Sequence, residues 1–177
     1  MLEVATLTPQ YNAYWQQLYE EAFPAIERFE FETLQQLARQ HEGLNLGIIL
    51  DGARPVGLVV YQLNTQNVHQ AFILFFAVDP NLRGEGLGAQ ALSCFKSMFP
   101  DGFVLECEYL DETADNYEQR QKRYRFYQKN GILESGYIAT IPAGVFYVLR
   151  SSEHITIADY LSMARPIFSE LEVDIDQ

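Results

Sequence analysis

The chain has 177 residues, of which 48% are hydrophobic and 14% aromatic, and this size and apolar content suit one globular domain with a core of its own. The net charge of −12 argues against nucleic acid as a partner. Residues 1–10 have neither the basic start nor the apolar core of a signal peptide, and no apolar stretch reaches the length of a membrane span, so we expect a cytoplasmic protein without a membrane partner.

Two helices are predicted at the start of the chain. Thr8-Pro9 is typical of a helix start, and apolar residues follow at helical spacing until Pro24 ends the pattern. A second helix is predicted over residues 31–41. The short segment between them carries aromatic side chains and a carboxylate, among them Glu27 and Phe29.

Three strands are predicted next, over residues 44–50, 56–63 and 68–78. Asp51-Gly52 is a hairpin signal between the first two strands, and residues 64–67 form the next turn. Short turns between consecutive strands predict an antiparallel meander.

The most informative segment follows the third strand. Asp79-Pro80 leads into a glycine-rich turn, and a helix is predicted over residues 87–99. Glycine lets the backbone come close to a ligand, and the N–H groups at a helix start attract anions. Seven consecutive residues are therefore predicted to cradle a pyrophosphate: Arg83, Gly84, Glu85, Gly86, Leu87, Gly88 and Ala89.

A dinucleotide-binding turn is the alternative for this segment. Gly84, Gly86 and Ala89 match its spacing, and Glu106 lies about twenty residues beyond, where a ribose-binding acid is expected. The context disfavours it, because residues 79–83 separate the glycines from the strand and the preceding strands form a meander instead of a βαβ unit. A purely structural turn is disfavoured by the backbone entropy that alternating glycines cost at a helix start.

The rest of the chain alternates strands and helices. The predicted elements are a strand over 102–109, a helix over 116–130 that Gly131 ends, short strands over 135–139 and 144–149, and a tail helix over 157–170 that Pro166 interrupts.

Charge is unevenly distributed over the middle of the chain. Residues 101–118 hold seven acidic residues and no basic one, whereas residues 120–129 hold five basic residues and no acidic one. The basic cluster is either a solvated helix face or a positive patch beside bound phosphates, and Arg120 is its first member.

Two motifs in this order resemble those of the GNAT (Gcn5-related N-acetyltransferase) acyltransferases. Arg83, Gly86 and Gly88 match the first motif, and Phe126, Tyr127, Lys129 and Gly131 match the second, with Ile132 in place of the usual Phe. The resemblance implies a mixed α/β fold of order ααβββαβαββ over residues 1–150, followed by a tail helix within 151–177. It also implies that the glycine-rich loop binds the pyrophosphate of acetyl-CoA and that the main chain near Ala77 and Val78 holds the acetyl carbonyl.

The resemblance assigns a general acid but leaves the base open. Tyr127 occupies the position of the tyrosine that protonates the departing thiolate in this family. The third strand, where many relatives carry the base, has no carboxylate. Glu106 and Glu108 alternate with apolar residues on the next strand, so they share one face and are the candidates for the base; the alternative is that they form ion pairs. Arg120 stands where many relatives bind pantetheine with Asn, and a phosphate contact is expected instead.

The acceptor is expected to be a small cationic amine, with a peptide N-terminus or a lysine side chain as the alternative. In this family the first two helices and their connecting loop line the acceptor pocket, which here implies Glu27, Phe29 and Phe31. Carboxylates beside aromatic rings suit a cation. The reaction predicted is transfer of an acetyl group from acetyl-CoA to a primary amine; a non-catalytic CoA-binding or sensor module is the alternative.

Other features predict less. Cys94 and Cys107 are expected to be buried free thiols, and with the three histidines they form no metal-type spacing, so no metal is expected. The sequence leaves both a monomer and a homodimer open. The tail could cover the site, pack on the sheet or mediate dimer contacts.

Overall fold

A computed structural model describes all residues, 1–177, as one mixed sheet with helices on both faces. The eight strands run in the order β1-β2-β3-β4-β5-β7-β6-β8. Their bounds are β1 Leu2–Thr6, β2 Leu44–Asp51, β3 Arg54–Asn64, β4 Asn67–Val78, β5 Phe103–Glu108, β6 Leu133–Ile141, β7 Gly144–Arg150 and β8 Glu172–Ile175. The helices are α1 Asn12–Ala22, α2 Phe31–Gln40, α3 Leu87–Met98, α4 Tyr117–Lys129 and α5 Ile157–Ala164, with 3-10 turns η1 Pro9–Tyr11 and η2 Pro80–Leu82.

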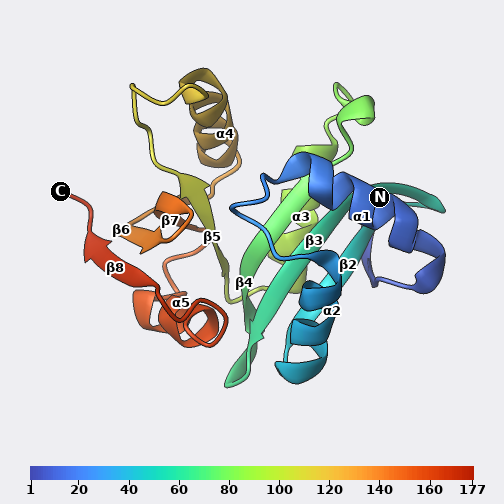
Figure 1. The fold of residues 1–177 in the computed structure, drawn as a ribbon, viewed down its shortest axis with the longest axis horizontal. Helices are drawn as coiled ribbons and strands as arrows, with labels where there is room; N and C mark the ends of the chain where they lie inside the picture. Colours follow the sequence, from blue (N-terminus) through green and yellow to red (C-terminus); the bar gives the residue numbers. More distant parts are fainter.

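The sheet divides at its centre, between β4 and β5. All neighbouring strands are antiparallel except this pair, which is parallel and is joined by the crossover helix α3. The pairing covers only residues 71–73 of β4 and 103–105 of β5, and beyond it the strands diverge (Figure 1). The end of β4 continues into the glycine-rich turn, and the end of β5 continues into the segment that precedes α4.

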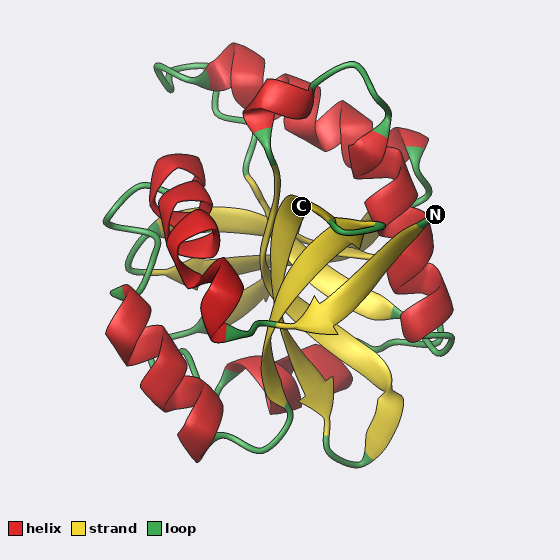
Figure 2. Ribbon diagram, turned by 90° about the vertical axis from the view of Figure 1, so that its right-hand side faces the viewer, coloured by secondary structure: helices red, strands yellow, loops and turns green.

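Apolar side chains alternate along the strands, and this alternation builds a core on each face of the sheet. Helices cover both faces (Figure 2). On one face α3 and α4 pack on Val59, Ile73 and Leu105. On the other face α1 and α2 cover β2–β4, and α5 covers the part of the sheet that contains Phe72 and Val148. Leu74 contacts both clusters of this second face, so it marks the line where they meet.

The meander, the crossover helix and the two helices that precede the meander are confirmed close to their predicted bounds. Gly52 in the hairpin turn has φ +62°, and Gly131 after α4 has φ +78°, so both glycines end their elements as expected. The mixed α/β fold class is confirmed. Both cysteines are free, and Cys107 is buried as predicted, but Cys94 is partly exposed instead of buried. None of the five helices combines the length and the apolar character needed to cross a bilayer.

The predicted element order missed two strands at the edges of the sheet. Residues 2–6 form β1, which pairs with β2, and residues 172–175 form β8, which pairs with β6. The predicted tail helix ends at Ala164, before Pro166, instead of at residue 170. The partners of these two strands are far away in the sequence, so no hairpin turn next to either strand indicates the pairing. The tail therefore packs on the sheet and extends it.

Candidate functional site

Two side chains fix the start of the glycine-rich loop. The Asp79 carboxylate accepts a hydrogen bond from the Asn81 N–H at 2.9 Å, which caps η2. Its other oxygen accepts a hydrogen bond at 3.0 Å from the hydroxyl of Tyr14 on α1. The loop is thus attached to α1 by a contact that no local sequence pattern indicated.

The loop backbone takes conformations that favour glycine. Gly84 has φ +88°, and Gly86 has φ +72° and precedes the first residue of α3. Residues 83–86 are exposed. The N–H groups of the first helical turn, at Leu87, Gly88 and Ala89, have no intrahelical partner and lie at the positive end of the helix dipole. This arrangement can bind an anion such as a phosphate.

Gly88 serves a different purpose from the other two glycines. A Cβ at this position would lie 3.0 Å from Cζ of Phe126 on α4. The missing side chain therefore lets α3 and α4 approach each other beside the loop, and Phe126 is held against the helix start.

The charges around the loop are arranged to accept an anion. Arg83 is exposed and takes part in none of the four ion pairs of the structure. Glu85 would repel a phosphate, but its carboxylate lies 3.0 Å from Arg54, which also contacts Asp51 at 2.8 Å. Exposed ion pairs of this kind add little stability. The positive charge of Arg54 does, however, offset the negative charge of Glu85 beside the loop.

A β-bulge at Leu74 lies where the sheet divides. Val60 pairs with Phe75 and Tyr61 with Ile73, so Leu74 has no opposing residue on β3. Beyond Ile73 the edge of β4 that faces β5 has no strand partner, and Ala77 and Val78 on it are partly exposed. This edge supplies unpaired main-chain groups next to the glycine-rich loop.

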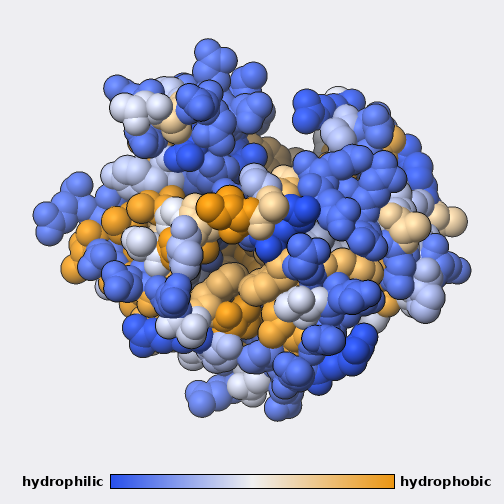
Figure 3. All heavy atoms as spheres, in the orientation of Figure 1, coloured by the Kyte–Doolittle hydropathy of each residue, from blue (hydrophilic) through white to orange (hydrophobic).

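The surface is hollowed between the two halves of the molecule. Figure 3 shows apolar atoms exposed in this hollow and hydrophilic atoms around it. An elongated ligand with a polar end at the loop and an apolar arm between the strands would fit these surroundings.

Tyr127 lies on the face of the sheet that α3 and α4 cover. Its side chain is 7% exposed and packs in the same core cluster as Cys107 and Leu105. Burial, and next the neighbouring Cys107, raise the pKa of the Tyr127 phenol above its ordinary value, so the group is protonated at neutral pH. It can act as a proton donor there.

Glu106 and Glu108 share a face, as predicted, and it is the face opposite Tyr127. Val104, on the same face, packs in the cluster with α5, whereas Leu105 and Cys107 between them pack in the cluster with Tyr127. Tyr127 and the two carboxylates therefore lie on opposite faces of the sheet.

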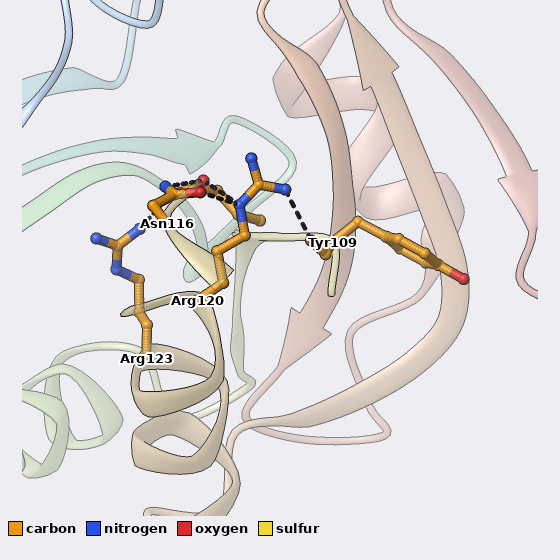
Figure 4. Close-up of polar contacts among 5 residues, drawn as sticks. Tyr109, Asn116, Arg120 and Arg123 are labelled. Carbon is orange, nitrogen blue, oxygen red and sulfur yellow. Dashed lines mark hydrogen bonds and ion pairs between the residues drawn. The ribbon is translucent and has the colours of Figure 1, made fainter. Parts of the chain in front are cut away.

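Glu108 is tied to two arginines of α4 (Figure 4). One carboxylate oxygen lies 2.9 Å from Arg120 Nε and accepts a hydrogen bond from Asn116 Nδ2 at 3.2 Å, and the other contacts Arg123. Both carboxylate oxygens therefore have partners on α4 or at its start. These contacts support the predicted alternative of an ion pair for Glu108.

Arg120 is engaged away from the glycine-rich loop. Its Nε donates a hydrogen bond to Asn116 Oδ1 at 2.8 Å, and its Nη1 donates to the Tyr109 carbonyl at 2.9 Å (Figure 4). Together with Glu108 these partners engage the Nε and Nη1 groups of the guanidinium. The contacts give Arg120 a structural role, joining α4 to the end of β5, instead of the phosphate contact expected for it.

Glu106 has surroundings suited to a base. The residue is partly exposed, but its Oε2 is buried and has no hydrogen-bond partner. Burial raises the pKa of Glu106 to about 7, and the Tyr160 hydroxyl on α5 opposes this shift. A carboxyl that titrates near neutral pH can take a proton and release it again.

The α1–α2 loop places Glu27 opposite the Glu108 ion pair. Burial and then Glu108 raise the pKa of the Glu27 carboxyl, while Arg123 and Arg120 lower it. Glu27 on the loop between α1 and α2 therefore lies within electrostatic range of the ion pairs between β5 and α4.

Of the predicted acceptor-binding aromatics, one is at the surface of the loop and one is in the core. Phe29 is partly exposed and stacks on Phe168 of the tail with ring centroids 5.8 Å apart. Phe31 is 9% exposed and packs on Trp15 at 5.6 Å, so its ring belongs to the core beneath α1 and α2. The prediction that Phe31 lines the pocket is not supported, because it is the first residue of α2 and its side chain faces the sheet.

Sequence reasoning missed Tyr160 and Phe168, which the tail brings to the site. The start of α5 had a readable signal, because Thr156 and Asp159 form a capping box in which each side chain bonds the other's main-chain N–H. No local pattern could show that Tyr160 would lie beside Glu106.

A separate hollow of about 330 Å³ lies between the α2–β2 turn, the β3–β4 hairpin and α5. Gln62 on its wall already donates hydrogen bonds to the carbonyls of Glu42 and Leu63, both at 2.8 Å. Its polar groups thus connect the surrounding turns, and it contains none of the site residues above. No three His, Cys, Asp or Glu side chains are grouped as metal ligands would be.

The chain matches the sequence model of the acetyltransferase (GNAT) family over residues 8–132. No curated protein sequence matches it. A solved structure from Bacteroides thetaiotaomicron, described as an acetyltransferase of the GNAT family, superposes with a TM-score of 0.70 at 21% identity, covering 89% of this chain and 91% of that one.

Two further structures show the same fold at lower identity. A variant of the spermidine N-acetyltransferase SpeG from Vibrio cholerae has a TM-score of 0.62 at 14% identity, covering 89% of this chain and 98% of that one. The protein AAC(6')-Ib, in complex with ribostamycin and coenzyme A, has a TM-score of 0.64 at 12% identity, covering 86% and 93%.

Proposed function

This chain belongs to the GNAT acetyltransferase family, and we propose that it transfers an acetyl group from acetyl-CoA to the primary amine of a small cationic metabolite. The observation that carries the proposal is the exposed Arg83–Gly86 turn, which opens α3 beside the unpaired edge of β4. Main-chain N–H groups of the turn and of the first helical turn would hold the pyrophosphate, with Arg83 as the nearby positive charge. The thioester arm would lie between β4 and β5.

The reaction would use groups on both faces of the sheet. The neutral amine attacks the thioester carbonyl, the C–N bond forms, and main-chain N–H groups on the β4 edge near Ala77 and Val78 stabilise the oxyanion. Glu106 takes the proton that the amine nitrogen loses. When the C–S bond breaks, Tyr127 gives its proton to the thiolate, so the products are the amide and free CoA.

Charge supports a cationic acceptor. Glu27 is a half-buried carboxylate that makes none of the four ion pairs, and Phe29 lies on the same loop. A carboxylate beside an aromatic ring attracts an ammonium group. The neighbours of similar fold include a spermidine N-acetyltransferase and a protein bound to ribostamycin, and we extend that kind of acceptor to this chain as part of the proposal.

A CoA-binding module without turnover is the rival function, and the absence of a carboxylate on β4 was its main support. Glu106 on β5 weakens that support, because a carboxyl that titrates near pH 7 stands beside the opening.

Release of free thiol from acetyl-CoA, measured with polyamines, aminoglycosides and neutral or anionic amines, tests the proposal. We expect turnover with the cationic amines. In Glu27→Gln we expect a higher KM for the amine and therefore a lower rate at the same amine concentration. Binding of CoA by calorimetry without thiol release from any acceptor would favour the binding module. Turnover with only neutral or anionic acceptors would refute the cationic-acceptor part.

A further inference from the structure

Two polar atoms of the core, one on β5 and one on α5, have no hydrogen-bond partner. Among the buried side-chain oxygens and nitrogens of the structure, only Glu106 Oε2 and the Tyr160 hydroxyl are in this position. They lie close enough that each shifts the pKa of the other, yet they do not form a hydrogen bond of normal geometry. A polar pair of this kind lowers stability and is uncommon in a core, which points to a function.

The surroundings fix Tyr160 firmly. Its side chain is fully buried, and its ring lies edge-on to Phe72 with centroids 5.3 Å apart. The helix that carries it begins at the Thr156–Asp159 capping box, and Asp159 Oδ2 also lies 3.4 Å from Gln70 Nε2 on β4. Two contacts therefore hold the Tyr160 ring and its helix against β4, and Val104 of β5 packs in the same apolar cluster.

The other charged groups near Glu106 have partners of their own. Glu108 on the same strand is paired with Arg120 and Arg123. On α5, Asp159 accepts hydrogen bonds from Thr156. On β7, Arg150 donates to the Ile155 carbonyl at 3.0 Å, and Tyr147 packs in the cluster of the opposite face. Tyr160 is thus the titratable group that acts on Glu106.

The position of Glu106 on β5 connects this pair to the proposed site. Leu105 is the last residue of β5 that pairs with β4, so Glu106 is the first residue at the opening between the strands. On its other side it pairs with Val148 of β7. The pair therefore lies at the inner end of the space in which the acyl group would be held.

Resting on the function proposed above, we propose that Tyr160 is a positioning residue that orients and stabilises the ionised Glu106 carboxylate as the base for the attacking amine. The phenol donates a hydrogen bond to the carboxylate when the carboxylate is ionised, and the proton from the amine then goes to Glu106. The tail, residues 151–177, is in this view a part of the catalytic site, because it supplies the group that keeps the base ionised.

Tyr160→Phe removes the hydroxyl and keeps the ring, so it tests the pair directly. A hydrogen bond from the phenol favours the ionised carboxylate, and its loss should move the titration of Glu106 upward by about one pH unit. The measurement is the pH dependence of the glutamate carboxyl ¹³C signals, with Glu106 assigned by the signal missing in Glu106→Gln. Tyr61→Phe, a half-buried tyrosine that packs on Phe99 on the other face of the sheet, is the control and should leave Glu106 unchanged.

Kinetics tests the role in the reaction. The acidic limb of the kcat/KM profile should move upward by the same pH unit in Tyr160→Phe, which lowers kcat/KM about tenfold at pH 6 and leaves it near the parent value at pH 9. The Kd of acetyl-CoA should not change. Circular dichroism at each pH verifies that the variant is folded.

The outcomes separate the two proposals. Equal Glu106 titration in Tyr160→Phe and the parent overturns the pairing, whether or not the protein is active. A shifted titration with an unmoved acidic limb overturns the positioning role while leaving the acetyltransferase activity intact. A parent protein that acetylates no amine refutes the proposed function itself.

Discussion

Glu108 and Arg120 form an ion pair across the end of β5 and the first turn of α4, with Oε2 2.9 Å from Nε. The Glu108 side chain is 12% exposed and that of Arg120 is 23% exposed, so the pair is shielded from solvent. Arg120 also bonds the Tyr109 carbonyl. These contacts hold the start of α4 against the end of β5, next to the opening between β4 and β5.

Arg120→Ala should destabilise the fold and leave CoA binding nearly unchanged. Removing Arg120 leaves Glu108 with Arg123 and the Asn116 amide, and for a pair this shielded we expect a loss of about 1–3 kcal/mol in the free energy of unfolding. Urea denaturation measures the loss, and calorimetry with CoA at two salt concentrations measures the affinity. A weaker affinity with a flatter salt dependence would show instead that Arg120 contacts phosphate.

Gly86→Ala should weaken CoA binding, and Gly52→Ala supplies a matched control. Both glycines have positive φ, +72° and +62°, and neither site would place a new Cβ within 3.4 Å of another residue. Each substitution should therefore cost about 1 kcal/mol of stability from backbone conformation alone. Only Gly86 belongs to the proposed phosphate-binding loop, so only Gly86→Ala should raise the Kd of CoA, by about tenfold or more. Equal Kd values for the two variants would contradict a phosphate site at this loop.

Tyr127→Phe should lower kcat at least about tenfold, because the thiolate loses its proton donor, with little change in the Kd of acetyl-CoA. Tyr124→Phe is the comparison, since Tyr124 is one helical turn away and packs on Tyr147 with centroids 5.3 Å apart. Initial rates of thiol release and calorimetry provide the two readouts. If Tyr124→Phe is the slower variant, the donor is Tyr124.

Glu106 should make the protein less stable as pH rises from about 5 to 8. Its pKa is raised in the folded state from 4.5 to about 7, so the folded protein holds the proton more tightly than the unfolded chain does. The resulting stability is fully present below the unfolded pKa and is lost as pH rises through the folded pKa, a loss of about 3 kcal/mol.

Urea denaturation of the parent and of Glu106→Gln at pH 5 and pH 8 measures this effect. The parent should lose more stability than the variant between the two pH values, and the difference isolates Glu106 from the other carboxyls. Parallel changes in both proteins would mean that Glu106 titrates near its ordinary value.

The glycine-rich loop and the meander were predictable from residues 44–99 because their causes are local. The conformations of Gly84 and Gly86, the Asp79-Pro80 turn and the start of α3 depend on neighbours a few residues away. Strands joined by short turns pair with each other, and alternating apolar residues identify their buried faces. The family resemblance rested on the same contiguous segments, and the family match and the fold confirmed it.

Contacts between distant segments decided the remaining features. Glu106 and Glu108 look alike in the sequence, yet one lies beside Tyr160 and the other between two arginines, because α5 covers one end of the face and α4 reaches the other. Strands β1 and β8 exist through partners more than forty and about thirty residues away, and Phe31 is buried through Trp15. Burial and the charge of neighbouring groups determine the ionisation of a side chain, and both depend on how the chain packs and not on the local amino-acid sequence.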